Sequence, residues 1–107
     1  MHHNLYHDIP RTLPTELIDI IAETGAVRIE RIVSHGHTSD PDVWYDQDTD
    51  EFVLLLSGKA RLAFADHTLD LHPGDYLIIK AHQKHRVVWT DPQCDTIWLA
   101  VHYETDK

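Results

Sequence analysis

A chain of 107 residues is long enough for one domain with a modest core, and its content of 42% hydrophobic and 25% charged residues is typical of a folded globular protein. The formal net charge of −9 argues against nucleic acid and anionic membranes as partners, because both repel an acidic surface. Its longest unbroken apolar run, 52–56, is far shorter than the roughly 20 residues of a transmembrane helix. The N-terminus lacks the apolar core of a signal peptide, and the lone Cys94 excludes an internal disulfide, so we expect a cytoplasmic protein.

The first element expected along the chain is a short helix within residues 13–25 (LPTELIDIIAETG). Pro14 and Thr15 are typical of a helix start, and Gly25 is typical of a helix end. Four apolar side chains between these ends form one broad face: Leu17, Ile18, Ile20 and Ile21. We therefore expect residues 1–26 to form an N-terminal arm and helix that braces the rest of the domain.

The remainder of the chain has the pattern of short strands separated by turn residues. The expected strands lie at residues 26–33, 51–57, 59–65, 67–71, 76–81, 85–90 and 96–103. Ser57-Gly58 indicates a hairpin-like break, and HPGD at residues 72–75 is a turn, because Pro and Gly occupy positions that turns favour. Many short strands with one terminal helix predict an all-β sandwich or barrel.

Two stretches of the strand region resemble the paired motifs of the cupin superfamily, which are small jelly-roll β-barrels. Glu51 is followed, after six residues, by Gly58, and Gly74 opens a strand that leads to His85. The first cupin motif runs His-x-His, three or four residues, Glu, six residues, Gly. The second runs Gly, five residues, Pro-x-Gly, two residues, His. The resemblance spans residues 27–103 and implies a single cupin barrel domain over residues 27–107.

Two positions of the second motif differ from the family pattern. Lys80 stands where the motif has Pro, and His82 stands where it has Gly. That glycine often lies in a turn with positive φ, a conformation that a histidine adopts only at some energetic cost.

The His-x-His pair of the first motif can be placed in two registers. In the first, the pair is His35-Gly36-His37, and thirteen residues then separate it from Glu51, so the connecting loop is much longer than usual. In the second, Tyr45-Asp46-Gln47 takes the place of the pair at the expected spacing of three residues before Glu51. The second register needs no insertion, which favours it, but His35 or His37 can still reach the mouth of a pocket from the preceding loop.

In the cupin superfamily these four motif residues hold one metal ion inside the barrel. The resemblance implies Glu51 and His85 as metal ligands, joined by Gln47 or His37 according to the register. Imidazole and carboxylate suit Fe, Mn, Ni, Zn or Cu, whereas an amide oxygen is a poorer ligand, so a site with Gln47 would hold its ion weakly. The alternative is structural: Glu51 forms a cross-strand ion pair, and His85 is an inward residue held by hydrogen bonds.

We therefore expect a small cupin that binds a divalent metal ion and acts on a small polar molecule as an isomerase, oxygenase or lyase. Tyr45, His82 and His102 are the candidates for proton transfer. The alternative is a non-catalytic small-molecule-binding or regulatory cupin that has lost tight metal binding. The resemblance also implies a homodimer, which would cover exposed sheet edges.

Overall fold

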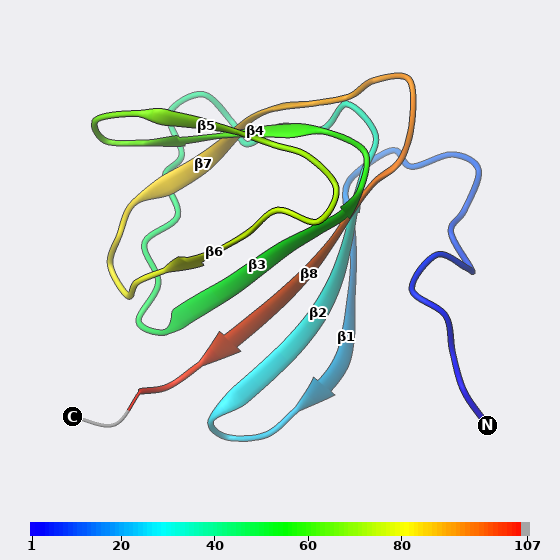
Figure 1. The fold of residues 1–107 in the computed structure, drawn as a ribbon, viewed down its shortest axis with the longest axis horizontal. Coiled ribbons are helices and arrows are strands. Elements are labelled where there is room, and N and C mark those ends of the chain that lie inside the picture. Colours follow the sequence, from blue (N-terminus) through cyan, green and yellow to red (C-terminus); the bar gives the residue numbers. More distant parts are fainter. Residues whose placement is uncertain (106–107) are drawn as a thin grey trace.

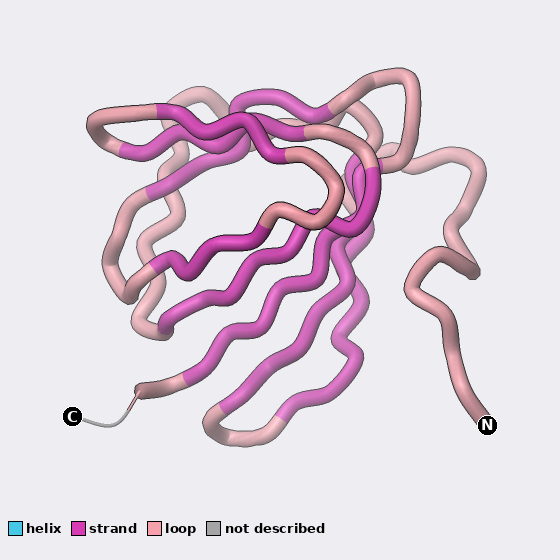
Figure 2. The backbone as a smooth tube through the Cα atoms, viewed as in Figure 1, coloured by secondary structure: helices cyan, strands magenta, loops and turns pink. Residues whose placement is uncertain are grey.

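The computed structural model describes residues 1–105 and contains two antiparallel sheets that face each other (Figures 1 and 2). The five-stranded sheet has the order β1 (Leu17–Glu23), β2 (Val27–Ser34), β8 (Thr96–Tyr103), β3 (Asp50–Ser57) and β6 (Tyr76–Ile79). The three-stranded sheet has the order β5 (Thr68–Leu71), β4 (Ala60–Phe64) and β7 (His85–Thr90). All seven strands expected after Gly25 are confirmed, and the all-β fold with them.

The expected N-terminal helix is wrong, because Leu17–Glu23 form strand β1 and pair antiparallel with β2. The apolar positions that suggest a helical face also fit a strand with a bulge, which lies between Ile20 and Ala22. Isoleucine is β-branched and favours extended backbone, and β1 contains three isoleucines. The Thr24 hydroxyl accepts hydrogen bonds from the backbone N–H groups of Ala26 and Val27, both at 3.1 Å, and so fixes the turn into β2. No helix within residues 1–105 is long and apolar enough to span a bilayer.

The expected hairpin at Ser57-Gly58 is also wrong, because β3 and β4 belong to different sheets and do not pair. The chain instead crosses from one sheet to the other at Gly58, which has a φ of +84°. A Cβ atom at this position would lie 2.6 Å from the Thr96 Cα and 2.8 Å from the Asp95 carbonyl oxygen. Glycine is therefore required both for the backbone conformation and for the close approach to β8.

The hydrophobic core fills the space between the two sheets at one end of the sandwich. Its buried members are Val53, Leu55, Ala60, Leu62, Phe64, Leu71, Ile79 and Trp98. Strand alternation places Val53 and Leu55 on the inner face of β3, and the same rule also turns Glu51 inward. The inner faces of β3 and β8 therefore change from apolar to polar along their length, and the polar end is where the candidate site lies.

The N-terminal arm lies beside β1 and is fastened to the outer face of the five-stranded sheet (Figure 1). The buried Arg31 side chain makes the attachment: its guanidinium donates hydrogen bonds to the carbonyl oxygens of Leu5, His7 and Asp8 and pairs with the Asp19 carboxylate. A charged group that donates several hydrogen bonds at once contributes more than an exposed ion pair.

We expect Arg31→Met to release the arm and to lower the free energy of unfolding by about 2 kcal/mol, because the hydrogen bonds of the guanidinium to the arm carbonyls and to Asp19 are lost. The exposed Arg11 is the one Lys or Arg in the first 27 residues, so trypsin cleavage after Arg11 reports on release. Arg61→Met is the matched control, because Arg61 pairs with Asp70 at the exposed surface of the other sheet. Equal cleavage rates in both variants would show that Arg31 does not hold the arm.

Candidate functional site

A cavity of about 350 Å³ opens between the sheets at the polar end of the sandwich. The inward positions of β2, β8 and β3 supply four of its polar side chains, namely Arg28, Glu30, His102 and Glu51. The segment before β3 supplies Tyr45 and Gln47, and β7 supplies His85. The apolar wall consists of Ile18, Ile32, Val53, Leu62, Ile79, Val87, Trp98 and Ala100. A small molecule in this cavity would meet polar groups on one side and an apolar wall on the other.

The segment that carries Tyr45 and Gln47 is fixed to β7 by backbone hydrogen bonds. The Tyr45 N–H donates to the His85 carbonyl oxygen at 2.8 Å, and the His85 N–H donates back to the Tyr45 carbonyl oxygen at 3.2 Å. The structure thus brings Tyr45, Gln47, Glu51 and His85 to one cavity, which is the arrangement of the second motif register.

His37, which the first register uses, is not among the cavity-lining residues of the described chain. Its Nε2 lies 3.0 Å from the Leu13 carbonyl oxygen, and its Nδ1 accepts a hydrogen bond from the His35 N–H at 2.9 Å. Both ring nitrogens are therefore engaged in the loop before the cavity. The structure does not bring His37 together with Gln47, Glu51 and His85.

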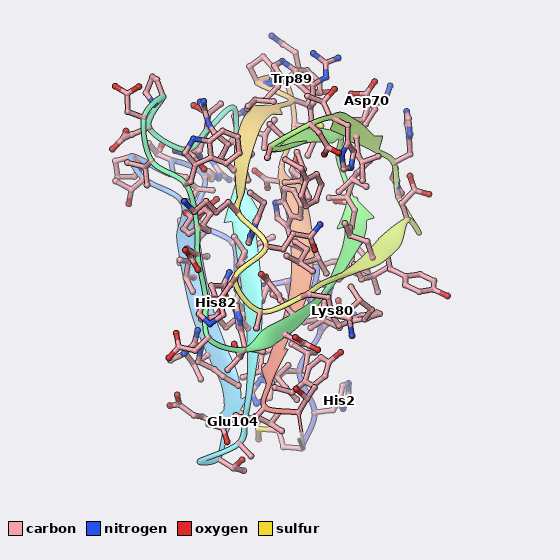
Figure 3. The ribbon with its side chains drawn as sticks, turned by 90° about the vertical axis from the view of Figure 1, so that its left-hand side faces the viewer. His2, Asp70, Lys80, His82, Trp89 and Glu104 are labelled. Carbon is pink, nitrogen blue, oxygen red and sulfur yellow. The ribbon has the colours of Figure 1, made fainter. Side chains whose placement is uncertain are left out.

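His82 lies outside the cavity, on the loop between β6 and β7, beside the segment that leads into β3 (Figure 3). It has the positive φ, +65°, of the glycine that it replaces in the motif. His82 Nδ1 lies 2.8 Å from Asp46 Oδ1, and the backbone N–H of His82 donates to the Gln47 carbonyl oxygen at 2.7 Å. These bonds offset the cost of the strained backbone and hold Gln47 in place, so His82 positions the site from outside it.

Glu51 is buried and finds partners from three neighbouring segments. The Gln47 amide N–H donates to Glu51 Oε1 at 3.0 Å, and His85 Nε2 lies 3.6 Å from the same oxygen. On the other side, His102 Nε2 lies 3.8 Å from Glu51 Oε2. A buried carboxylate without partners would be costly, and the Gln47 amide supplies the hydrogen bond that the burial of Glu51 requires.

His85 has a fixed orientation because its Nδ1 lies 3.0 Å from the Gln83 carbonyl oxygen. An Nδ1–H that donates there leaves Nε2 as an acceptor directed at Gln47 and Glu51. The second N–H of the Gln47 amide, 3.5 Å away, can donate to this Nε2. In this tautomer the Gln47 amide is the donor that links the Glu51 carboxylate to His85 Nε2.

The same three residues can be tested as ligands of a metal ion. Their facing atoms lie 3.0, 3.5 and 3.6 Å apart, and ligands about 2.1 Å from one ion are spaced at about 3.0–3.4 Å. The oxygen and nitrogen of a glutamine amide exchange places by a half-turn, so Gln47 can present its oxygen instead. Only the Gln47–Glu51 spacing lies within that range, so a small side-chain movement would be needed to bring two good ligands and one weak one around a divalent ion. Within residues 1–105, no group of three or more His, Cys, Asp or Glu side chains is placed so that it could hold a metal ion.

His102 joins this trio to a second polar group on β2. Its Nε2 lies 3.0 Å from Glu30 Oε1, while Arg28 Nε donates to Glu30 Oε2 at 3.1 Å. Cross-strand registry explains the arrangement, because Arg28 and Glu51 both lie directly opposite His102 in the sheet. His102 therefore lies between the carboxylates of Glu30 and Glu51, and Arg28 holds the Glu30 carboxylate in place.

Tyr45 completes the polar side of the cavity as a neutral phenol. Burial raises the pKa of Tyr45 above its usual value, and the carboxylates of Glu16 and Glu51 raise it further, although a hydrogen bond with Ser39 acts in the opposite direction. The phenol remains protonated at neutral pH and can donate a hydrogen bond to a bound molecule.

Arg28 and Glu30 are cavity residues that the sequence did not single out. Alternation in residues 26–33 places Val27 and Ile29 on one face, and charged residues on the other face of a strand are usually solvated. In the structure, the charged face points between the sheets and Ile29 points outward. One feature of the sequence could have revealed that this face is buried: Ile32 lies on the same face as Arg28 and Glu30, and it forms part of the apolar wall.

A two-sheet antiparallel sandwich with a mixed polar cavity between its sheets defines a small jelly-roll protein of the cupin type. The sequence profile of the cupin domain matches residues 28–102, which is most of the chain. The protein therefore belongs to the cupin family. A search of curated proteins found no match.

Several solved structures share the fold. A protein from Ralstonia eutropha JMP134, provisionally assigned as a mannose-6-phosphate isomerase, is 40% identical; the alignment covers 98% of this chain and 99% of that one, with a TM-score of 0.93. A cupin superfamily protein from Desulfitobacterium hafniense DCB-2 is 22% identical over 91% of this chain and 84% of that one, with a TM-score of 0.76. KdgF from Halomonas sp. is 18% identical over 97% and 94%, with a TM-score of 0.75.

Proposed function

We propose that this cupin is an enzyme that transfers a proton to or from a small polar molecule held in the cavity. The observation that carries the proposal is the placement of His102 Nε2 between Glu30, at 3.0 Å, and Glu51, at 3.8 Å, on the cavity wall. An imidazole and a carboxylate in such proximity can act as an acid–base pair when a substrate lies against them. Tyr45 supplies a third group that can donate a proton or a hydrogen bond.

The experiment that tests the proposal is hydrogen exchange into a bound compound. The protein is incubated in D₂O with small hydroxylated carbonyl compounds, and deuterium at carbon is followed by NMR. Incorporation far above the rate without protein is expected for at least one compound that binds. A compound that binds in the cavity without exchange would favour the second candidate, a binding protein, which the hydrogen bonds of Gln47 to Glu51 and His85 support.

We also propose that Gln47, Glu51 and His85 hold a divalent metal ion weakly, for which the spacing of their facing atoms is the support. When bound, such an ion would polarise an oxygen of the substrate. His85 is suited to this role because its hydrogen bond to Gln83 directs Nε2 at Glu51. The homodimer and the cytoplasmic location remain predictions.

Gln47→His should tighten metal binding by about tenfold or more, because it replaces an amide with an imidazole at the same point. Retained Zn²⁺ or Ni²⁺ after dialysis, measured by elemental analysis, is the readout. His37→Gln is the control and should leave metal content unchanged, since His37 lies outside the cavity. A Gln47→His protein that folds but binds no more metal than the wild type would remove position 47 from the ligand set.

A further inference from the structure

Arg28 is the only lysine or arginine among the described residues that line the cavity. Its side chain keeps 41% of its surface exposed, whereas the side chain of its partner Glu30 keeps 12%. The Arg28 Nε donates to Glu30 Oε2 at 3.1 Å, and His102 Nε2 lies 3.0 Å from the other oxygen, Oε1. The Glu30 carboxylate therefore has a partner on each oxygen, and a single hydrogen bond fixes the guanidinium at the rim of the cavity.

The edge of the Arg28 guanidinium formed by Nη1 and Nη2 is unused. Within residues 1–105, neither atom has a hydrogen-bond partner, and neither is buried. An arginine that serves to neutralise a carboxylate frequently binds it through two parallel N–H groups, which Arg28 does not do with Glu30. Arg31, on the opposite face of the same strand, donates through its Nε, Nη1 and Nη2. Arg28 instead retains the N–H donors of both Nη atoms for another acceptor.

The other carboxylates near this cavity do not occupy the free edge of Arg28. Glu16 accepts a hydrogen bond from the Ser34 hydroxyl at 2.9 Å, at the far end of β2 and about 20 Å from Arg28 along the strand. Glu51 lies two strands away, on β3. Glu23 lies opposite Arg28 on β1, but within the described chain Arg28 forms its ion pair with Glu30 alone. The acceptor that this edge lacks is therefore an oxyanion from outside the chain.

Cross-strand registry places Arg28 in line with the proposed acid–base groups. Arg28, His102 and Glu51 occupy directly opposite positions on β2, β8 and β3, and all three line the cavity. Neighbouring strands lie about 4.8 Å apart, so the backbones at Arg28 and Glu51 are separated by about 10 Å. A small molecule held at one end by Arg28 would therefore lie across His102, with its other end near Glu51.

We propose that Arg28 is the specificity-determining residue of this cavity and that it binds an oxyanion, a carboxylate or a phosphate group, at one end of the ligand. The proposal rests on the proposed function, since it takes this cavity as the ligand site. The planar fork of a guanidinium matches two oxygens of either group. Binding at this end orients the rest of the molecule for proton transfer at His102.

The side-chain Nε–H signal of Arg28 in the NMR spectrum of the ¹⁵N-labelled protein reports binding directly, and its absence from Arg28→Lys assigns it. The protein is first treated with a chelator, so that no metal ion contributes to anion binding. Two matched pairs are then titrated: lactate beside lactamide, and glycerol 3-phosphate beside glycerol. The anion of at least one pair should shift the Arg28 signal to saturation and bind about tenfold or more tightly than its uncharged counterpart. The pair that responds distinguishes a carboxylate site from a phosphate site.

Arg28→Gln should abolish the preference for the anion, because the amide can still donate to Glu30 but offers no charged fork. Arg61→Gln is the matched control and should keep the preference, since Arg61 pairs with Asp70 at the exposed surface of the other sheet. A preference that persists in a folded Arg28→Gln protein would overturn the proposal, as would the absence of a preference in both pairs.

These results can be separated from the fate of the proposed proton transfer. Anion binding at Arg28 without deuterium exchange into any compound would leave Arg28 as the anchor of a binding protein. Exchange into uncharged compounds, with no anion bound at Arg28, would support proton transfer and overturn the role of Arg28.

Discussion

Gly58→Ala should lower the free energy of unfolding by about 3–5 kcal/mol, because two costs coincide at this crossing between the sheets. An alanine at φ +84° pays the strain of the left-handed region. Its Cβ would also lie 2.6 Å from the Thr96 Cα and 2.8 Å from the Asp95 carbonyl oxygen, distances at which the β8 backbone must move. Urea denaturation followed by tryptophan fluorescence measures the loss.

Gly74→Ala is the matched control because only one of the two costs applies to it. Gly74 has a φ of +94°, but a Cβ there would meet nothing within 4 Å. We expect a loss of about 1 kcal/mol, attributable to backbone strain alone. If the two variants were equally stable, β8 would accommodate the extra methyl group without cost. The close approach at Gly58 would then make no contribution to the loss of stability in Gly58→Ala.

The strands could be predicted from sequence because each is short, apolar on at least one face, and bounded by residues that favour turns. β1 could not, because Leu17, Ile18, Ile20 and Ile21 fit a helical face as well as a strand interrupted by a bulge. The pairing with β2 decides between helix and strand. Local propensity carries no information about contacts between separate segments of the chain. The sheet change at Gly58 was missed for the same reason, since a turn signal does not reveal which strands pair on either side.

In the candidate site too, some residues could be indicated from the sequence, whereas others required contacts between distant segments. The resemblance to the cupin motifs could indicate Glu51 and His85, because the motif distances place them relative to Gly58 and Gly74. The choice between His37 and Gln47 required the bridge between Tyr45 and His85, which joins segments forty residues apart in sequence. Arg28 and Glu30 follow an alternation that shows two faces of a strand but not which face is buried.

His102→Gln should lower the rate of catalysed deuterium exchange by about 100-fold or more, the contribution typical of a general acid–base group. Glutamine can keep a hydrogen bond to Glu30 Oε1 but cannot take up and return a proton, so binding of the compound should change little. His35→Gln is the control, because His35 pairs with Asp95 at the exposed surface, outside the cavity-lining set.

The comparison of rate with affinity is what distinguishes a proton carrier from a structural histidine. If His102 only supported Glu30 and Glu51, its loss would weaken binding and lower the thermal midpoint while the exchange rate of the bound compound stayed near that of the wild type. A slow rate with unchanged binding identifies chemistry at the imidazole. Exchange at the wild-type rate in a folded His102→Gln protein would instead direct the search to the other acid–base groups of the cavity, among them Glu51 and the neutral phenol of Tyr45.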